Sequence, residues 1–125
     1  MATMSTRNEV TRMLEIIGVL PLLNFELAQE DAANPKSDLK IHLLAASRAG
    51  IPPNGGMVVE DSPAGVQASL AAGMHVIATA TPFTECGLRG APELDPQWVV
   101  HDSPKLIPTV QRLMAGREPS GLSAP

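Results

Sequence analysis

Aromatic residues and cysteine are the scarcest components of this chain. Only 2% of its 125 residues are aromatic and none is tyrosine, although 44% are hydrophobic. A core formed by this sequence must therefore be built from Ala, Val, Ile, Leu and Met. The single cysteine, Cys86, excludes an internal disulfide and fits a reducing compartment, so we expect a cytoplasmic protein.

Long apolar runs and a positive net charge are also missing. No run is long enough to span a bilayer, and the first residues lack the apolar segment of a secretory signal peptide. The formal net charge of −4 gives no reason to expect nucleic acid or an anionic membrane as a partner. The length suits one domain, which we expect to comprise residues 1–115, followed by a disordered tail rich in Gly, Pro and Ser at residues 116–125.

Helical and strand patterns alternate along the chain, which is typical of an α/β fold with a parallel sheet flanked by helices. Helices are expected at residues 6–17, 38–49, 63–72 and 103–114, the first three ending at Gly18, Gly50 and Gly73. Strands are expected at residues 25–28, 57–59, 75–79 and 98–100, and loops at residues 29–35 and 81–96. In the first helix, Met13, Leu14 and Ile17 have helical spacing and are expected in the core.

Two adjacent acids, Glu60 and Asp61, directly follow the short apolar strand expected at residues 57–59. Ser62 follows as a helix N-cap, and Pro63 as the first helical residue, where a missing N–H costs nothing. Open α/β sheets bind ligands at the carboxyl ends of their strands, and carboxylate oxygens suit Mg²⁺. The pattern therefore predicts a ligand or metal site at this strand end.

This stretch resembles the fourth motif of haloacid dehalogenase (HAD) superfamily phosphatases, in particular the phosphoglycolate phosphatase and β-phosphoglucomutase branch. That motif commonly reads Glu-Asp-Ser-x-x-Gly before an alanine-rich helix, and here it reads Glu60-Asp61-Ser62-Pro63-Ala64-Gly65. The resemblance implies that Asp61 holds the catalytic Mg²⁺ and that Glu60 assists.

Two further segments resemble motifs of the same family. Lys36 stands before a predicted helix, as the third-motif lysine does, although the usual Gly-Lys-Pro-x-Pro context is replaced here by Pro35-Lys36-Ser37-Asp38-Leu39. By the resemblance it would neutralise charge on the phosphoryl group; otherwise it is a solvated lysine near a helix start. Thr3 resembles the second-motif hydroxyl that hydrogen-bonds a phosphoryl oxygen, while Ser5 or Thr6 can cap the first helix.

The first family motif, Asp-x-Asp-Gly-Thr, does not occur in these 125 residues. In the family it supplies the aspartate nucleophile and sits on the central strand of the sheet. The resemblance therefore implies an incomplete HAD-type, Rossmann-like parallel sheet that lacks the motif-one strand and the cap domain. Such a sheet would have a gap with unpaired edges, and self-association through those edges is expected.

Three functional hypotheses follow. The preferred one is the carboxyl-terminal part of a HAD-like, Mg²⁺-dependent phosphatase for a small phosphorylated metabolite, inactive alone and with weak or absent Mg²⁺ binding. The alternative is a non-catalytic binding or interaction module derived from such a domain. A third is a different metal enzyme that pairs Asp61 with Asp102. His42, His75 and His101 lack metal-ligand spacing and are expected at the surface or at strand ends.

Overall fold

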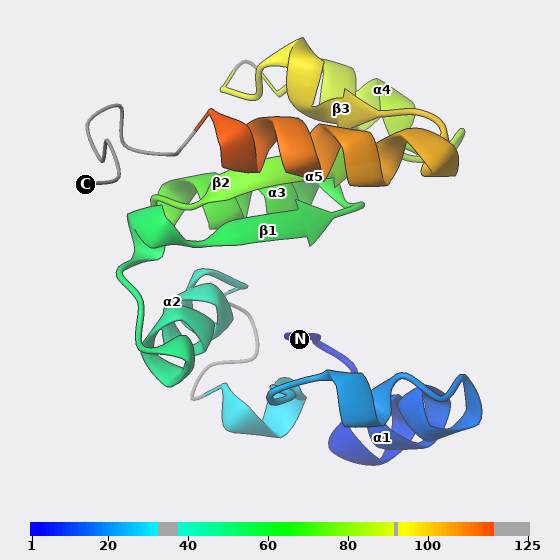
Figure 1. Cartoon of the computed structure of the whole chain (residues 1–125), viewed down its shortest axis with the longest axis vertical. Coiled ribbons are helices and arrows are strands. Elements are labelled where there is room, and N and C mark those ends of the chain that lie inside the picture. The colour runs from blue at the N-terminus through cyan, green and yellow to red at the C-terminus, as the bar shows by residue number, and fades with distance from the viewer. Residues whose placement is uncertain (33–37, 92, 117–125) are drawn as a thin grey trace, which may run out of the picture.

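The computed structural model describes residues 1–32, 38–91 and 93–116 of the chain, and we refer to these as the described residues. Its centre is a three-stranded parallel sheet of order β1-β2-β3, in which β1 spans Met57–Glu60, β2 His75–Thr79 and β3 Val99–Val100 (Figure 1). The α/β parallel fold predicted from the sequence is confirmed. Of the predicted tail at residues 116–125, residues 117–125 lie outside the described residues.

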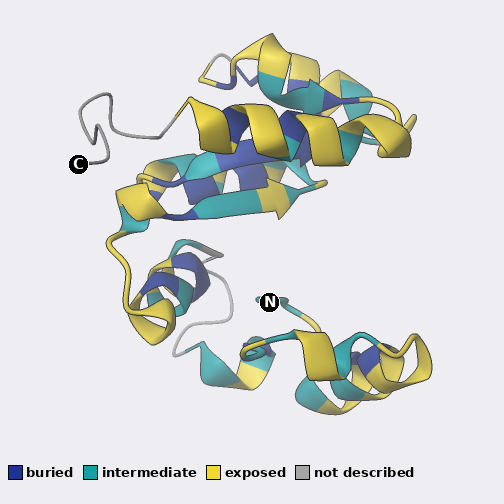
Figure 2. Cartoon of the chain, viewed as in Figure 1, coloured by how far each residue is buried: buried dark blue, intermediate teal, exposed yellow. Residues whose placement is uncertain are grey.

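The central strand β2 is buried on both faces (Figure 2). Helix α3, Pro63–Ala71, covers one face, where Val66 packs with Val76 and Ala78. Helix α5, Leu106–Ala115, covers the other, where Ile77 packs with Leu113. Side chains of a strand alternate between its two faces, so β2 contributes to both hydrophobic clusters. The aliphatic core expected from the composition is therefore observed.

The predicted helix ends agree closely with the structure. Helix α1 spans Arg7–Ile16, with Thr6 as its N-cap in a capping box with Glu9. Helix α2 spans Asp38–Ala49, as expected. The glycines that follow the first three long helices have left-handed backbone angles, with φ of 75° at Gly18, 69° at Gly50 and 81° at Gly73.

Several expectations for the second half of the chain were wrong in detail. The segment expected to be loop-rich, residues 81–96, contains a short helix, α4 at Glu85–Arg89. Trp98, expected in the last strand, instead ends a 3₁₀ turn, η4 at Pro96–Trp98, and β3 begins one residue later. The last helix does not begin at Ser103: a 3₁₀ turn, η5 at Ser103–Lys105, precedes α5. Further 3₁₀ turns are η1 at Leu20–Leu22, η2 at Gln29–Asp31 and η3 at Pro53–Gly55.

Residues 1–32, which we call the N-terminal lobe, lie on the side of β1 away from β2 (Figure 1). The strand expected at residues 25–28 is reduced to one parallel bridge between Ala2 and Leu27. This lobe has its own hydrophobic cluster of Val10, Leu14 and Ala28. Met13 and Ile17, expected in the core, are instead 52% and 61% exposed.

The sheet therefore has the gap expected from the resemblance, because the bridge in the N-terminal lobe is not part of the three-stranded sheet. Among the described residues, no helix is both long and apolar enough to cross a membrane.

Candidate functional site

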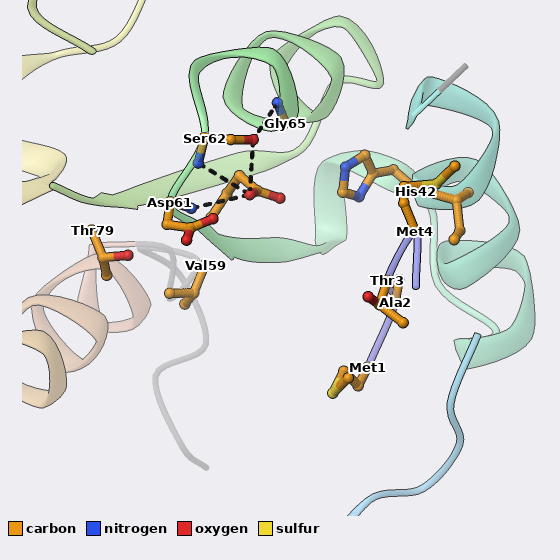
Figure 3. A pocket seen from close by; sticks show the side chains of 12 residues that line it. Met1, Ala2, Thr3, Met4, His42, Val59, Asp61, Ser62, Gly65 and Thr79 are labelled. Carbon is orange, nitrogen blue, oxygen red and sulfur yellow. Dashed lines mark hydrogen bonds between the residues drawn. The ribbon is translucent and has the colours of Figure 1, made fainter. Parts of the chain in front are cut away.

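A cavity of about 520 Å³ lies at the carboxyl end of β1, between the sheet and the N-terminal lobe (Figure 3). It brings together three of the four residues predicted for the site: Thr3, Glu60 and Asp61. Lys36, the fourth, lies outside the described residues. The remaining lining residues are Met1, Ala2, Met4, Ile41, His42, Val59, Ser62, Gly65 and Thr79.

Glu60 turns its carboxylate toward the start of α3. Its Oε1 accepts hydrogen bonds from the backbone N–H of Asp61 (3.1 Å), the backbone N–H of Ser62 (3.2 Å) and the Ser62 hydroxyl (3.2 Å). Its other oxygen, Oε2, lies against Gly65, within 2.5 Å of the place where a Cβ at that position would stand. Glu60 thus holds the turn between β1 and α3 in place.

The turn is completed by Ser62, the N-cap predicted from the sequence. Its Oγ accepts a hydrogen bond of 3.0 Å from the Gly65 backbone N–H, and Pro63 opens the helix. Asp61 is exposed directly after the last residue of β1. Because Glu60 fixes its backbone N–H, the Asp61 carboxylate is held at the carboxyl end of the sheet.

Thr3 belongs to the N-terminal lobe and lies across the cavity from Asp61 (Figure 3). Its backbone N–H donates to the Leu27 carbonyl (2.9 Å), which anchors the residue to the lobe. Its Oγ1 accepts a hydrogen bond of 3.2 Å from the Ser5 N–H. The hydroxyl hydrogen is left to donate to an anionic ligand, because that bond uses only an acceptor lone pair.

His42 is a lining residue that the sequence interpretation missed. It is 7% exposed, not at the surface as expected, and its Nε2 lies 3.1 Å from Oγ of the fully buried Ser69. Ser69 donates its hydroxyl hydrogen to the Gly65 carbonyl (2.7 Å), so His42 is the donor to Ser69. The four-residue spacing from the buried Ala46 is the signal that would have placed His42 inside.

The acid named in the third hypothesis lies elsewhere. Asp102 forms an ion pair with Lys105 (3.3 Å) and is not among the residues that line the cavity around Asp61. The neighbouring His101 lies 3.8 Å from Glu85. Within residues 1–32, 38–91 and 93–116, no group of three or more His, Cys, Asp or Glu side chains is placed to hold a metal ion.

A family model described as haloacid dehalogenase-like hydrolase matches residues 1–79. The chain belongs to this haloacid dehalogenase-like family. Hexitol phosphatase A of Escherichia coli (strain K12) is 40% identical over 73 residues, which are 58% of this chain and 34% of that protein. The chain thus spans about a third of the length of this curated relative.

A solved structure supports the fold. The crystal structure of a candidate β-phosphoglucomutase from Thermotoga maritima matches 90% of this chain and 51% of its own, with a TM-score of 0.76 and 20% sequence identity. At this identity the likeness concerns the fold alone. The Rossmann-like, HAD-type arrangement expected from the motifs is therefore confirmed.

Proposed function

We propose that this chain forms the metal- and phosphate-binding part of a HAD-like phosphatase that acts on a small phosphorylated metabolite. One observation carries the proposal: Thr3 and the pair of Glu60 and Asp61 are far apart in sequence but line one cavity at the carboxyl end of the sheet. The name of hexitol phosphatase A supports a phosphorylated sugar alcohol or a related compound as the substrate class.

The side chains in the cavity fit a divalent cation through Asp61. This carboxylate is exposed at the strand end and offers the hard oxygen ligands that Mg²⁺ prefers. Glu60 has its Oε1 engaged by three donors, so we assign it the role of orienting Asp61, in place of the assisting ligand role that the resemblance implies. Mg²⁺ held there would offset negative charge on the phosphoryl group.

The remaining residues would bind phosphate. Thr3 has a hydroxyl hydrogen to donate to a phosphoryl oxygen from the opposite wall of the cavity. Lys36, by the family resemblance, would supply the compact positive charge. The nucleophilic aspartate of the family has no counterpart in the 125 residues, which contain no Asp-x-Asp. We therefore expect the chain by itself to show no turnover.

Metal titration tests the two acids separately. By isothermal calorimetry we expect Mg²⁺ to bind the chain weakly, well above the micromolar range, because one carboxylate sheds few of the waters around the ion. Asp61→Asn should abolish the signal, and Glu60→Gln should reduce it less, since the amide oxygen still accepts hydrogen bonds. Glu85→Gln, an acid outside the cavity, is the matched control. An equal loss of Mg²⁺ binding in Asp61→Asn and Glu60→Gln would indicate that Glu60 is also a metal ligand.

Turnover is measured with an aryl phosphate in the presence of Mg²⁺. Hydrolysis by the purified chain that disappears in Asp61→Ala would contradict the expected inactivity. Hydrolysis that survives in Asp61→Ala would come from a contaminating phosphatase.

The second candidate function is a non-catalytic interaction module. The outer edge of β1 favours it, because no strand within residues 1–32, 38–91 and 93–116 pairs with that edge of the three-stranded sheet. Edge strands of this kind are templates for pairing with another chain.

A further inference from the structure

His42 connects helix α2 to the turn that carries the candidate metal ligand. It belongs to α2 and lines the 520 Å³ cavity that also contains Asp61. Figure 3 shows its imidazole directed toward the turn that carries Ser62 and Gly65. The side chain is buried, so its ring is held in place by its neighbours.

A continuous series of hydrogen bonds begins at His42 and ends at Glu60. The His42 Nε2–H donates to Ser69 Oγ (3.1 Å), and the Ser69 hydroxyl donates to the Gly65 carbonyl (2.7 Å). The Gly65 N–H donates to Ser62 Oγ (3.0 Å), and the Ser62 hydroxyl donates to Glu60 Oε1 (3.2 Å). Hydrogen bonds that follow one another in this way polarise and strengthen each other. The imidazole on α2 is therefore linked to the carboxylate that holds the turn.

Gly65 is the point where this series meets the packing of the turn. The Glu60 carboxylate lies against Gly65, in the space that a Cβ at this position would need. Because the two are in close contact, the position of Gly65 restricts where the carboxylate can lie. The carboxylate in turn accepts from the Asp61 N–H, so a displacement of Gly65 would be passed on to Asp61.

The interface between α2 and α3 also has apolar contacts, with Ala46 and Ala72 in one hydrophobic cluster. Such contacts are non-directional, whereas a hydrogen bond requires a narrow range of distance and angle. The bond from His42 therefore fixes the two helices more closely than packing does. Helix α2 begins at Asp38, one turn before His42 and two residues after Lys36 in the sequence. The same bond thus connects the helix that follows the expected phosphate-binding lysine to the turn before α3.

We propose that His42 is a positioning residue for the candidate metal site. Through Ser69 and Gly65 it holds the turn around Glu60 in the conformation that presents the Asp61 carboxylate to a divalent cation. The inference rests on the proposed function, because it is Asp61 that would bind the cation, and His42 acts only through the turn. Both His42 and Ser69 lie outside the Glu-Asp-Ser-x-x-Gly motif, so the family resemblance does not assign them this role.

Three substitutions in the full chain separate the hydrogen bond from the packing. His42→Phe keeps a planar ring but has no donor, and Ser69→Ala removes the hydroxyl between the two helices. His42→Gln keeps an N–H donor at a similar reach and should restore the behaviour of the unmodified chain. Leu113→Ala is the matched control, because it removes buried volume on the face of β2 opposite α3. Ser69→Ala, the smaller change, carries the test if His42→Phe does not fold.

The first readout is amide hydrogen exchange measured by NMR without metal. It follows the three amides of the turn, which are those of Asp61, Ser62 and Gly65. In the two variants that break the series, these amides should exchange about threefold to tenfold faster, the factor that corresponds to one lost hydrogen bond. The His75 amide, which donates to the Gly56 carbonyl at the other end of β1, is the internal reference and should change less. In the glutamine variant and the matched control, the turn amides should exchange as in the unmodified chain.

The second readout is the affinity for Mg²⁺, obtained from the shifts of the same amides during titration with magnesium chloride. Breaking the series should weaken binding about threefold to tenfold, less than the roughly 10–100-fold typical of residues that contact a metal ligand directly. His42→Gln and Leu113→Ala should bind Mg²⁺ as the unmodified chain does. If the unmodified chain binds no Mg²⁺ while the turn amides respond as expected, the metal role of Asp61 fails and the role of His42 in holding the turn stands.

Three results would overturn the inference. The first is unchanged exchange of the turn amides in both His42→Phe and Ser69→Ala. The second is an equal acceleration at the turn and at His75, because the substitutions would then only lower the overall stability. The third is exchange as fast in His42→Gln as in His42→Phe, because the hydrogen bond would then not be the feature that holds the turn.

Discussion

Glu60 occupies the space that any side chain at position 65 would need. A Cβ built on Gly65 would stand 2.3 Å from Cδ of Glu60, a contact that real Cβ atoms do not make. The glycine of this motif is therefore explained by a close approach, not by an unusual backbone angle, since its φ lies outside the left-handed range. The same carboxylate holds the turn that presents Asp61.

The first prediction concerns this pair. Gly65→Ala should lower the free energy of unfolding by about 1–3 kcal/mol, because the Glu60 carboxylate must leave its three donors. In a Glu60→Ala background the same substitution should cost much less, since the obstructing side chain is gone. Urea denaturation of the four proteins gives the coupling, with Gly90→Ala, whose Cβ would make only ordinary contacts, as the matched control. Additive costs would show that the two residues do not interact.

The second prediction concerns the buried link between α2 and α3. Ser69→Ala removes the hydroxyl that accepts from His42 and donates to the Gly65 carbonyl, so it should lower the free energy of unfolding by about 1–3 kcal/mol. Ser47→Ala, on the exposed side of α2, should change it by less than about 0.5 kcal/mol. If both substitutions change the free energy of unfolding by the same small amount in thermal and urea unfolding, the contact between Ser69 and His42 does not stabilise the fold.

The third prediction is a pH dependence in the N-terminal lobe. The hydrogen bond from the Ala28 N–H holds the pKa of Asp31 below its ordinary value of 3.8, and the positive charge of Arg7 lowers this pKa further. Partial burial of the carboxylate opposes both effects. A carboxylate with a lowered pKa in the folded state stabilises it above the ordinary value, and the effect is lost as the pH falls through the folded pKa.

Asp31→Asn should therefore be less stable than the unmodified chain at neutral pH, and the difference should shrink in acid below pH 3.8. Arg7→Gln should show a smaller change of the same sign, because the Ala28 hydrogen bond remains. Unfolding curves between neutral pH and strong acid provide the measurement. If the difference in free energy of unfolding between the two proteins stays constant across this range, the charge of Asp31 does not stabilise the fold.

The fourth prediction separates two apolar residues near the C-terminal end of α1: Leu14, within the helix, and Ile17, its C-cap. Leu14 is 5% exposed and packs in the lobe cluster, so Leu14→Ala should lower the free energy of unfolding of the lobe by about 2–5 kcal/mol. Ile17 is 61% exposed, so Ile17→Ala should change it by less than about 0.5 kcal/mol. Helical circular dichroism during urea unfolding distinguishes the two. A large effect at Ile17 would mean that another surface covers it in solution.

Local signals in the sequence were sufficient for the elements that position Asp61. The apolar run at residues 57–59 predicted β1, and Ser62 and Pro63 predicted the start of α3, because caps and strand runs depend on neighbouring residues only. The short helix α4 escaped prediction, since five residues are too few to show a helical period. The start of α5 was misplaced because the first turn is 3₁₀.

The other half of the site depends on contacts between distant residues. Thr3 reaches the cavity because its segment pairs with Leu27 through one bridge, and no local pattern around residues 1–4 specifies that pairing. The family resemblance identified Thr3, and the residue pattern alone would not have done so. His42 was missed because its four-residue spacing from Ala46 shows that the two share a face of α2 but not what covers that face; its partner Ser69 is 27 residues away in the sequence.

The separate clusters have one more consequence for the cavity. The cluster of Val10, Leu14 and Ala28 lies entirely in residues 1–32, and the clusters around β2 and α3 draw only on residues after 38. Thr3 and Asp61 are therefore anchored to two different hydrophobic cores, one in the N-terminal lobe and one around the sheet. The distance between the Thr3 hydroxyl and the Asp61 carboxylate therefore depends on how the two cores are held together, and neither core determines it alone.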